Sequence, residues 1–259
     1  RFWGPIGLAW GVVAGALLHM IIQYPAAKFV GFRHQWIPIA SLWSDRYVRK
    51  ILFLMIPRVL GIAVNQINLF IITIFASTLA AGSIAVISFA QNLQSVPLGL
   101  FGISFSIVAF PALSVFSARE ERENFVKIFS QTFRQILFFV LPFSVALVVL
   151  RAQFVRVILG AGEFNWEDTI LTYQCLGIFS LSLFAQSTIP LLARSFYALH
   201  NTKTPFYIAL VSEGVNIISV ILLMGKFKAI GLAMAFSIAS VVQMLLLLFA
   251  LRTKLGKLD

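Results

Sequence analysis

Charged residues are scarce in this sequence. Of its 259 residues only 11% are Asp, Glu, Lys or Arg, whereas 60% are hydrophobic, and the mean hydropathy is +0.95. A water-soluble domain carries about 25% charged and about 45–50% apolar residues. The chain therefore has too few polar side chains to cover a soluble globular protein of its size. This composition excludes a soluble enzyme and predicts that the surrounding solvent is lipid.

Cysteine, histidine and acidic residues are also few, and each shortage removes a class of function. The single cysteine, Cys175, cannot form an internal disulfide or a metal site of several cysteines. The histidines, His19, His34 and His200, are scattered, and no HExxH, GxSxG or Walker-type element is present. Nine acidic residues against twenty Lys and Arg leave a net charge of +11. In a membrane protein this excess belongs to cytoplasmic loops, so no nucleic-acid partner is expected.

Long uncharged runs mark the expected membrane spans. The runs at 2–27, 169–193 and 229–251 each exceed the ~20 residues that a bilayer requires. A transmembrane β-barrel would instead need apolar–polar alternation, which these runs lack. The sequence therefore predicts an all-α, polytopic helical membrane protein. About seven transmembrane helices are expected, at 5–27, 51–75, 83–113, 128–150, 169–197, 206–224 and 229–251.

Positive charge is distributed unequally between the two sides of this predicted bundle. One side holds fourteen Lys and Arg and the other holds five. By the positive-inside rule the richer side is cytoplasmic, and the C-terminus lies there. The chain starts without an initiator Met or signal-peptide features, which favours an interior piece of a longer protein. The richer side consists of the segments 28–50, 114–134, 194–205 and 252–259.

Two capping motifs predict helix starts. Ser117 and Glu120 have the spacing of a capping box that would begin a helix at the cytoplasmic surface. Asn165 and Asp168 are expected to cap the fifth helix in a similar way.

Polar residues inside the second predicted span are candidates for a binding site, because each is costly at membrane depth. Arg58, Asn65 and Asn68 have helical spacing and share one face of the helix 51–75. The guanidinium of Arg58 suits bidentate binding of a phosphate. The alternative is an Arg side chain that snorkels to the cytoplasmic headgroups.

The helix 83–113 carries a longer stripe of small and polar residues. Pro97 interrupts the stripe and is expected to kink the helix. Kinked helices with polar faces form binding sites at bilayer depth, and Asn92 and Ser95 are the candidates here. Tight helix packing is the alternative explanation, above all for the glycines. The stripe consists of Ser88, Asn92, Ser95, Gly99, Gly102 and Ser106.

Glu213 is the only acidic residue inside any predicted span, and Asn216 follows it by three positions. A carboxylate in hydrocarbon pairs with a cation, binds an ion or takes up a proton. The two residues are therefore candidates for coupling to Na⁺ or H⁺, and no other cofactor is expected. The alternative is a structural ion pair, with Arg58 or with a basic residue elsewhere in the protein.

Short motifs occur in order along the whole chain, and together they closely resemble the MurJ/MviN family. That family comprises bacterial lipid II flippases of the multidrug/oligosaccharidyl-lipid/polysaccharide exporter superfamily. The motifs are Pro57-Arg58-Val59-Leu60-Gly61, Gln66-Ile67-Asn68, Ala76-Ser77, Gly82-Ser83, Pro97-Leu98-Gly99-Leu100-Phe101-Gly102, Phe110-Pro111-Ala112-Leu113-Ser114, Arg194-Ser195-Phe196-Tyr197-Ala198-Leu199 and Thr202-Lys203-Thr204-Pro205.

The resemblance implies two six-helix lobes around a central cavity. It implies a transporter that flips lipid II, a polyprenyl-pyrophosphate-linked peptidoglycan precursor, across the bacterial plasma (inner) membrane by alternating access, for cell-wall biogenesis and cell shape. The partners implied are this anionic lipid-linked substrate, membrane lipids and an N-terminal lobe of the same polypeptide. The chain then divides into the last helix of the first lobe (1–30), an interfacial cytoplasmic linker (31–50), the six-helix second lobe (51–252) and a cytoplasmic tail (253–259).

The resemblance also has two departures. Asn92 stands where the family usually has an Arg that is a proposed substrate contact, and Ile72 stands where it often has an Asp resembling a sodium ligand. An exporter of another lipid-linked glycan or amphiphile, or a non-transporting membrane scaffold, is therefore kept as an alternative. A membrane-embedded enzyme is disfavoured, because no acid–base pair accompanies a nucleophile. The expected substrate-binding residues are Arg58, Asn65, Asn68, Asn92 and Ser95, with Glu213 and Asn216 for ion coupling.

Overall fold

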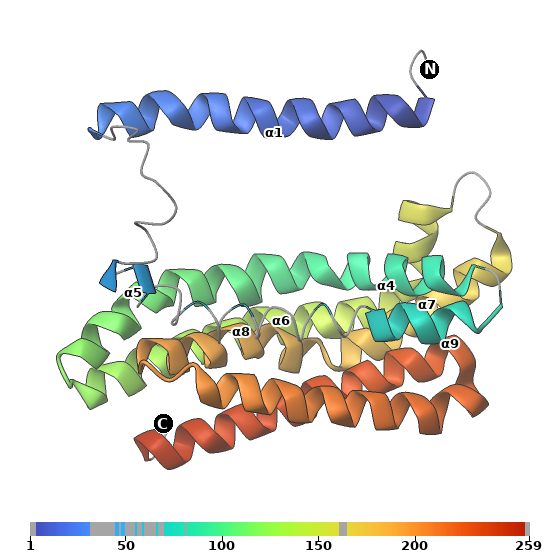
Figure 1. Cartoon of the computed structure of the whole chain (residues 1–259). Coiled ribbons are helices and arrows are strands. Elements are labelled where there is room, and N and C mark those ends of the chain that lie inside the picture. The colour runs from blue at the N-terminus through green and yellow to red at the C-terminus, as the bar shows by residue number, and fades with distance from the viewer. Residues whose placement is uncertain are drawn as a thin grey trace. The chain divides into compact units, whose positions relative to one another are not determined.

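The computed structural model describes residues 4–31, 70–80, 82–160 and 165–256, with a few positions between 45 and 66. Every regular element in these residues is a helix (Figure 1), which confirms the predicted all-α fold. The chain divides into two compact units, Arg1–Phe53 and Leu54–Asp259. The first unit contains α1 (Gly4–Phe29), which coincides with the predicted span 5–27.

The second unit consists of helices that run between its two ends (Figure 1). Its interior holds two apolar clusters, one around Phe125, Phe129 and Phe196 and the other around Leu176 and Phe179. In chain order the helices are α4 (Ser83–Pro97), η1 (Leu98–Ile103), α5 (Ser104–Ala118), α6 (Arg122–Leu159), α7 (Trp166–Leu181), α8 (Leu183–Ala198) and α9 (Lys203–Leu255).

Most of the predicted spans are present as helices. In the described part of the chain, α1, α6, α9 and the continuous α4–η1–α5 rod are each long and apolar enough to cross a membrane. α7 and α8 together make a fifth candidate, bent by 49°. The predicted helix 51–75 falls largely outside the described residues.

α9 is a hairpin of two spans. It contains 53 residues, about 80 Å at 1.5 Å per residue, against a hydrocarbon core of about 30 Å. Lys228 interrupts it with a non-helical backbone (φ 51°, ψ −128°). The Ser212 hydroxyl donates to the Ala239 carbonyl at 2.7 Å, so the two halves lie side by side. This confirms the predicted separation of 206–224 from 229–251.

The predicted single helix 169–197 is wrong in one respect, because α7 and α8 are separate helices that meet at Ser182. The sequence here is uncharged and has neither Pro nor Gly at the break, so nothing local indicates an interruption. The Ser182 hydroxyl donates to the Phe179 carbonyl at 3.1 Å. Such side-chain bonds offer the backbone an alternative to the regular helical ladder.

One of the two predicted capping boxes is confirmed. Asn165 accepts the Asp168 N–H at 2.8 Å, and the Asp168 carboxylate accepts the Asn165 N–H at 3.4 Å, so both bonds of the box form at the start of α7. The prediction at Ser117 is wrong, because this residue lies inside α5. The chain reverses instead at Glu120 (φ 59°), and α6 begins at Arg122.

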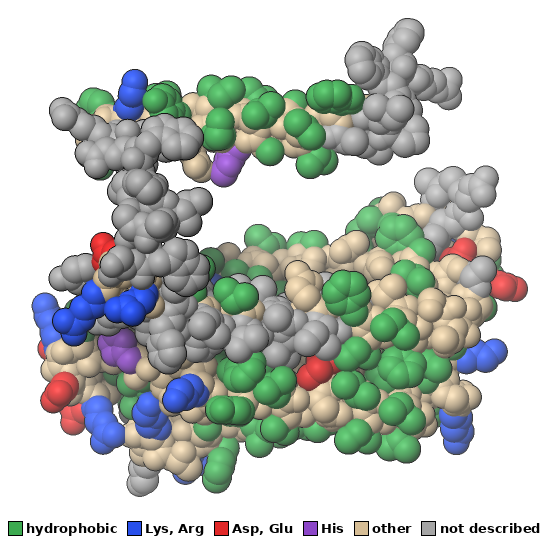
Figure 2. Space-filling model, in the orientation of Figure 1, with side chains coloured by type: hydrophobic (Ala, Val, Ile, Leu, Met, Phe, Trp, Pro, Cys, Tyr) green, Lys and Arg blue, Asp and Glu red, His purple; other side chains and the backbone are tan. Residues whose placement is uncertain are grey.

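Charge is segregated to the ends of the second unit. Figure 2 shows Lys and Arg gathered at its two ends, with hydrophobic side chains covering the middle. Ser117, Leu199 and Lys254, from three segments predicted to share one side of the membrane, line one cavity at a single end. A Cβ placed on Gly82 would lie 3.5 Å from the Asp168 carboxylate. The start of α4 therefore lies next to the start of α7, as expected if both are on the opposite side of the membrane. This pattern fits a protein embedded in a bilayer.

Candidate functional site

The predicted site residues of the helix 51–75 are not placed by this structure. Arg58, Asn65 and Asn68 lie outside the described residues. The end of this span, residues 70–77, is a described helical segment. Ile72, the position at which the family often has Asp, is 7% exposed and packs in the apolar cluster around Leu176 and Phe179. Ile72 is therefore a core residue.

Asn92 and Ser95 lie on the exposed face of α4. Both side chains are exposed, whereas Ala90 and Gln94 on the opposite face are buried. The Ser95 hydroxyl donates to the backbone carbonyl of Asn92 at 2.7 Å and so does not occupy the exposed side-chain amide of Asn92. An exposed amide on a membrane-depth helix offers two donors and an acceptor to a polar ligand.

The polar stripe does not stay on one face along the whole helix, contrary to the prediction. Ser88 is exposed, like Asn92 and Ser95, whereas Gly102 and Ser106 are buried. The π-helix η1 separates the two groups and follows Pro97, where the kink was predicted. Because a π-turn inserts one extra residue, it rotates the later positions by roughly 100°. Only the first half of the stripe can therefore face a ligand.

The buried half of the stripe packs against α8. A Cβ on Gly102 would lie 2.6 Å from the Ser187 carbonyl oxygen, so only glycine permits this approach. Ser106 accepts a hydrogen bond from the guanidinium of Arg194, a half-buried residue of α8. Arg194 begins the segment 194–205 that is predicted to be cytoplasmic, and its sequence gives no sign of this contact. No motif indicates a partner 88 positions away.

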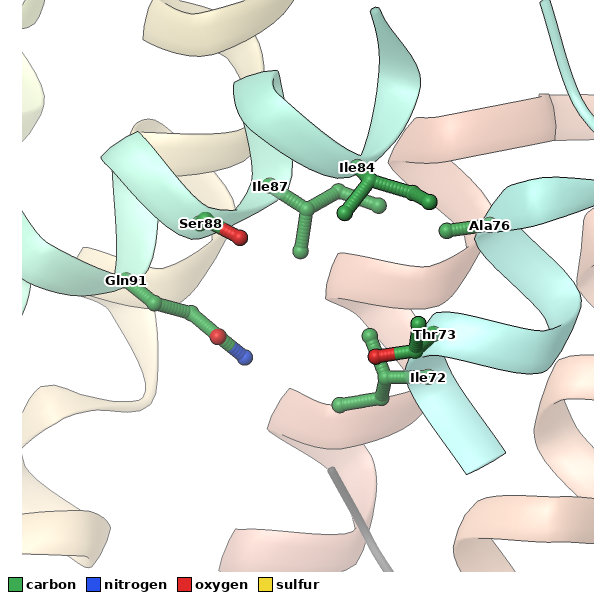
Figure 3. A pocket seen from close by; sticks show the side chains of 7 residues that line it. All are labelled: Ile72, Thr73, Ala76, Ile84, Ile87, Ser88 and Gln91. Carbon is green, nitrogen blue, oxygen red and sulfur yellow. The ribbon is translucent and has the colours of Figure 1, made fainter. Parts of the chain in front are cut away.

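A small cavity with both apolar and polar lining lies beside the exposed face of α4. It has a volume of about 50 Å³ and lies between the segment 70–77 and α4. The hydroxyls of Thr73 and Ser88 and the amide of Gln91 point into it (Figure 3). A single water needs roughly 10–15 Å³ of such space, so the cavity can hold a few waters. It extends the polar surface of Asn92 and Ser95 with further uncharged groups.

Glu213 and Asn216 form a pair on the first half of α9. The Asn216 amide donates to a Glu213 carboxylate oxygen at 3.3 Å. Asn216 is fully buried, and within the described part of the chain its carbonyl oxygen Oδ1 has no hydrogen-bond partner. A buried acceptor without a partner costs about 1–3 kcal/mol. The described residues contain no cluster of three or more His, Cys, Asp or Glu side chains that could hold a metal.

A buried polar network connects α4, the α7–α8 break and α9. The Gln186 amide donates to Gln94 Oε1 at 3.3 Å and to the Ser182 hydroxyl at 2.8 Å. Ser182 lies 3.0 Å from the hydroxyl of Ser237, which donates to the Ile178 carbonyl at 3.3 Å. These residues were not predicted as a set. The presence of Gln94 and Gln186 in uncharged spans is the one sequence feature that indicates a buried polar network. Which residues pair depends on the tertiary structure.

Comparison with known proteins identifies the family. The family described as lipid II flippase MurJ matches residues 3–259. The chain belongs to this MurJ family. A probable lipid II flippase MurJ of Bdellovibrio bacteriovorus is 30% identical over 248 residues, and one of Vibrio cholerae is 32% identical over 244. These alignments cover 95% and 93% of the chain but 46% of each relative, so the chain spans about half the length of the curated relatives it matches.

Solved structures give the same assignment. One described as lipid II flippase MurJ in an inward closed conformation superposes with a TM-score of 0.72 at 31% identity, over 85% of this chain and 45% of that one. An outward-facing multidrug resistance MATE transporter of the MOP superfamily has a TM-score of 0.71 at 15% identity, which shows likeness of fold alone. The chain is thus a multi-pass membrane protein with half of a MurJ-like fold, and its family is one of transporters rather than enzymes.

Proposed function

We propose that this chain is the second lobe, with the preceding helix, of a transporter that flips lipid II from the cytoplasmic to the outer leaflet by alternating access. The observation that carries the proposal is the match to the MurJ family along residues 3–259. The chain's half-length coverage of its relatives suits one of two lobes. The bacterial plasma membrane and an anionic lipid-linked substrate follow from the same proposal. The proposal also places the boundaries of the second lobe at residues 51 and 252.

The exposed face of α4 supports a substrate-binding role for Asn92 and Ser95. These residues offer hydrogen bonds at membrane depth, where hydrocarbon cannot use them. We place them, with Arg58, Asn65 and Asn68, on the wall of a central cavity that faces the other lobe. In this wall Arg58 supplies the positive charge for a pyrophosphate, and the amides bind neutral oxygens.

Glu213 and Asn216 support coupling to Na⁺ or H⁺. The free Asn216 Oδ1 and the Glu213 carboxylate put oxygen ligands within one helical turn. Hard cations bind oxygen ligands, and a carboxylate at membrane depth can also carry a proton. Ile72 contributes no ligand at the position of the usual Asp, so Glu213 would take over that role.

Genetic rescue tests the transport proposal. The full-length protein should restore growth to cells depleted of their own lipid II flippase, whereas Arg58→Ala should fail and Asn92→Leu should rescue poorly. Arg46→Ala and Val145→Leu are matched controls, because both side chains are exposed and neither lies on the helix 51–75 or on α4. Equal rescue by Arg58→Ala and the parent would remove Arg58 from the mechanism.

The second candidate is an exporter of another lipid-linked glycan or amphiphile, which the neutral Asn92 favours. A parent protein that reaches the membrane but does not rescue growth would support this candidate or a scaffold. Movement of a fluorescent undecaprenyl-linked glycan across the membrane of proteoliposomes would then separate the two candidates. An exporter should move this glycan, whereas a scaffold should move neither the glycan nor lipid II.

A further inference from the structure

A second and larger cavity opens at the end of the bundle where α5, α6, α8 and α9 meet. Its volume is about 320 Å³. None of its lining residues belongs to the proposed transport site on α4 and the first half of α9. Three charged residues line it, Glu120, Arg122 and Lys254. The combination of two cations and one carboxylate defines the chemistry that the cavity can bind.

The two cations are brought together by tertiary structure. The Arg122 guanidinium donates to the backbone carbonyl of Lys254 at 2.9 Å and so links the start of α6 to the end of α9. This bond uses one of the five guanidinium N–H groups. Arg122 is also the first residue of α6, where the helix dipole is positive. Together with the Lys254 ammonium, these groups suit a phosphate.

Glu120 provides the opposite charge beside them. It occupies the turn between α5 and α6 with a left-handed backbone (φ 59°) and lines the cavity. The neighbouring Glu121 is engaged elsewhere, 3.9 Å from Arg119 and accepting from Asn124 at 2.7 Å. A purely anionic ligand would be repelled by the Glu120 carboxylate, whereas a ligand with phosphate and ammonium groups complements all three charges.

Apart from Ser117, the rest of the lining is apolar. Phe125 is 1% exposed, and Phe116, Leu199 and Leu255 are half-buried. Free phosphate gains nothing from such a surface, but the glycerol and upper acyl chain of a phospholipid do. The cavity also lies at the end of the hydrophobic band of the bundle, at the level where lipid headgroups are found.

We propose that this cavity binds the phosphoethanolamine headgroup of a membrane phospholipid. The phosphate lies between Arg122 and Lys254, the ammonium donates to Glu120, and the acyl chains continue along the apolar lining. This inference does not depend on which substrate the protein transports.

Native mass spectrometry of the full-length protein in detergent tests the proposal, with phosphatidylethanolamine, phosphatidylcholine and phosphatidylglycerol as probes. Phosphatidylethanolamine should bind roughly threefold more tightly than phosphatidylcholine, whose quaternary ammonium cannot donate to Glu120. The double variant Arg122→Gln/Lys254→Gln should weaken phosphatidylethanolamine binding roughly tenfold. Lys254→Gln alone keeps the Arg122–carbonyl bond, so its weaker binding would not reflect fraying of α9.

Each control variant changes the net charge by the same amount as the variant it is compared with. Lys127→Gln/Arg252→Gln removes two exposed cations from the same helices outside the cavity and should leave binding unchanged. Glu120→Gln should abolish the preference for phosphatidylethanolamine over phosphatidylcholine, and Glu123→Gln should retain it. Equal binding of the three lipids by the parent, tighter binding of phosphatidylglycerol, displacement by millimolar inorganic phosphate, or equal loss in both cation variants would overturn the proposal.

Discussion

The side chain of Asn216 is the strongest structural support for the proposed ion-coupling site. It is fully buried, yet among the described residues only its NH₂ group has a hydrogen-bond partner, the Glu213 carboxylate. Buried polar groups in folded proteins are nearly always hydrogen-bonded. An orphan carbonyl oxygen next to a carboxylate therefore supports the proposed ion coupling more directly than either residue does alone.

Replacing the Glu213 carboxylate tests this pairing. Glu213→Gln keeps the shape and an acceptor but removes the charge, so transport should lose its dependence on Na⁺ or on pH. The measurement is flux into proteoliposomes under imposed Na⁺ and pH gradients. Glu167→Gln, on the exposed first turn of α7, is the control and should behave like the parent. An unaltered ion response in Glu213→Gln would return the residue to a structural role.

Two glycines of η1 provide a matched pair for stability. A Cβ on Gly102 would lie 2.6 Å from backbone oxygen of Ser187, whereas one on Gly99 would meet nothing within 4 Å. Gly102→Ala should destabilise the protein by about 1–3 kcal/mol, because α8 must move. At about 2–4 °C per kcal/mol, the loss is measurable as a lower Tm in detergent. Gly99→Ala should leave Tm unchanged or raise it, and equal Tm values for the two variants would refute the close-packing argument.

At the scale of elements, two interruptions shape the bundle. η1 turns the second half of the polar stripe into the core, and the break at Ser182 bends α7–α8 by 49°. The first could be anticipated from Pro97, which cannot donate to the helical ladder. The second could not, because a serine inside an apolar helix usually bonds within its own turn. Here Ser182 also bonds to α8 and α9, and these contacts depend on the tertiary fold.

The Gln94–Gln186 bond should behave as a coupled pair. Gln186→Leu leaves Gln94 Oε1 buried without its donor, and Gln94→Leu leaves the Gln186 amide with only its bond to Ser182, so each should cost about 1–3 kcal/mol. The double variant replaces both amides with apolar groups and should cost less than the sum of the two. A double-mutant cycle on thermal unfolding measures this difference. Strict additivity would mean that the 3.3 Å contact contributes nothing.

At the scale of the molecule, the predicted charge asymmetry has a structural counterpart. The α5–α6 turn and the ends of α8 and α9 meet around one cavity, as their assignment to one side of the membrane requires. The assignment of that side to the cytoplasm remains a prediction from the positive-inside rule.

Cysteine labelling tests this orientation. The single native Cys175 is fully buried, so it should not react with a membrane-impermeant maleimide. Thr253→Cys and Lys226→Cys place exposed thiols on opposite sides of the predicted span 229–251 of α9. In intact spheroplasts Lys226→Cys should label at once, and Thr253→Cys only after permeabilisation. The reverse pattern would invert the topology.

The sequence alone determined the lipid environment, the helical class of the fold and most of the spans in the described residues, because hydropathy and the length of uncharged runs are local properties. It also determined the family, through motifs that extend along the whole chain. Tertiary structure decided which half of the α4–α5 stripe is exposed, where α7–α8 breaks and which glutamines pair. Each of these depends on contacts between residues tens of positions apart, and no spacing within one helix encodes them.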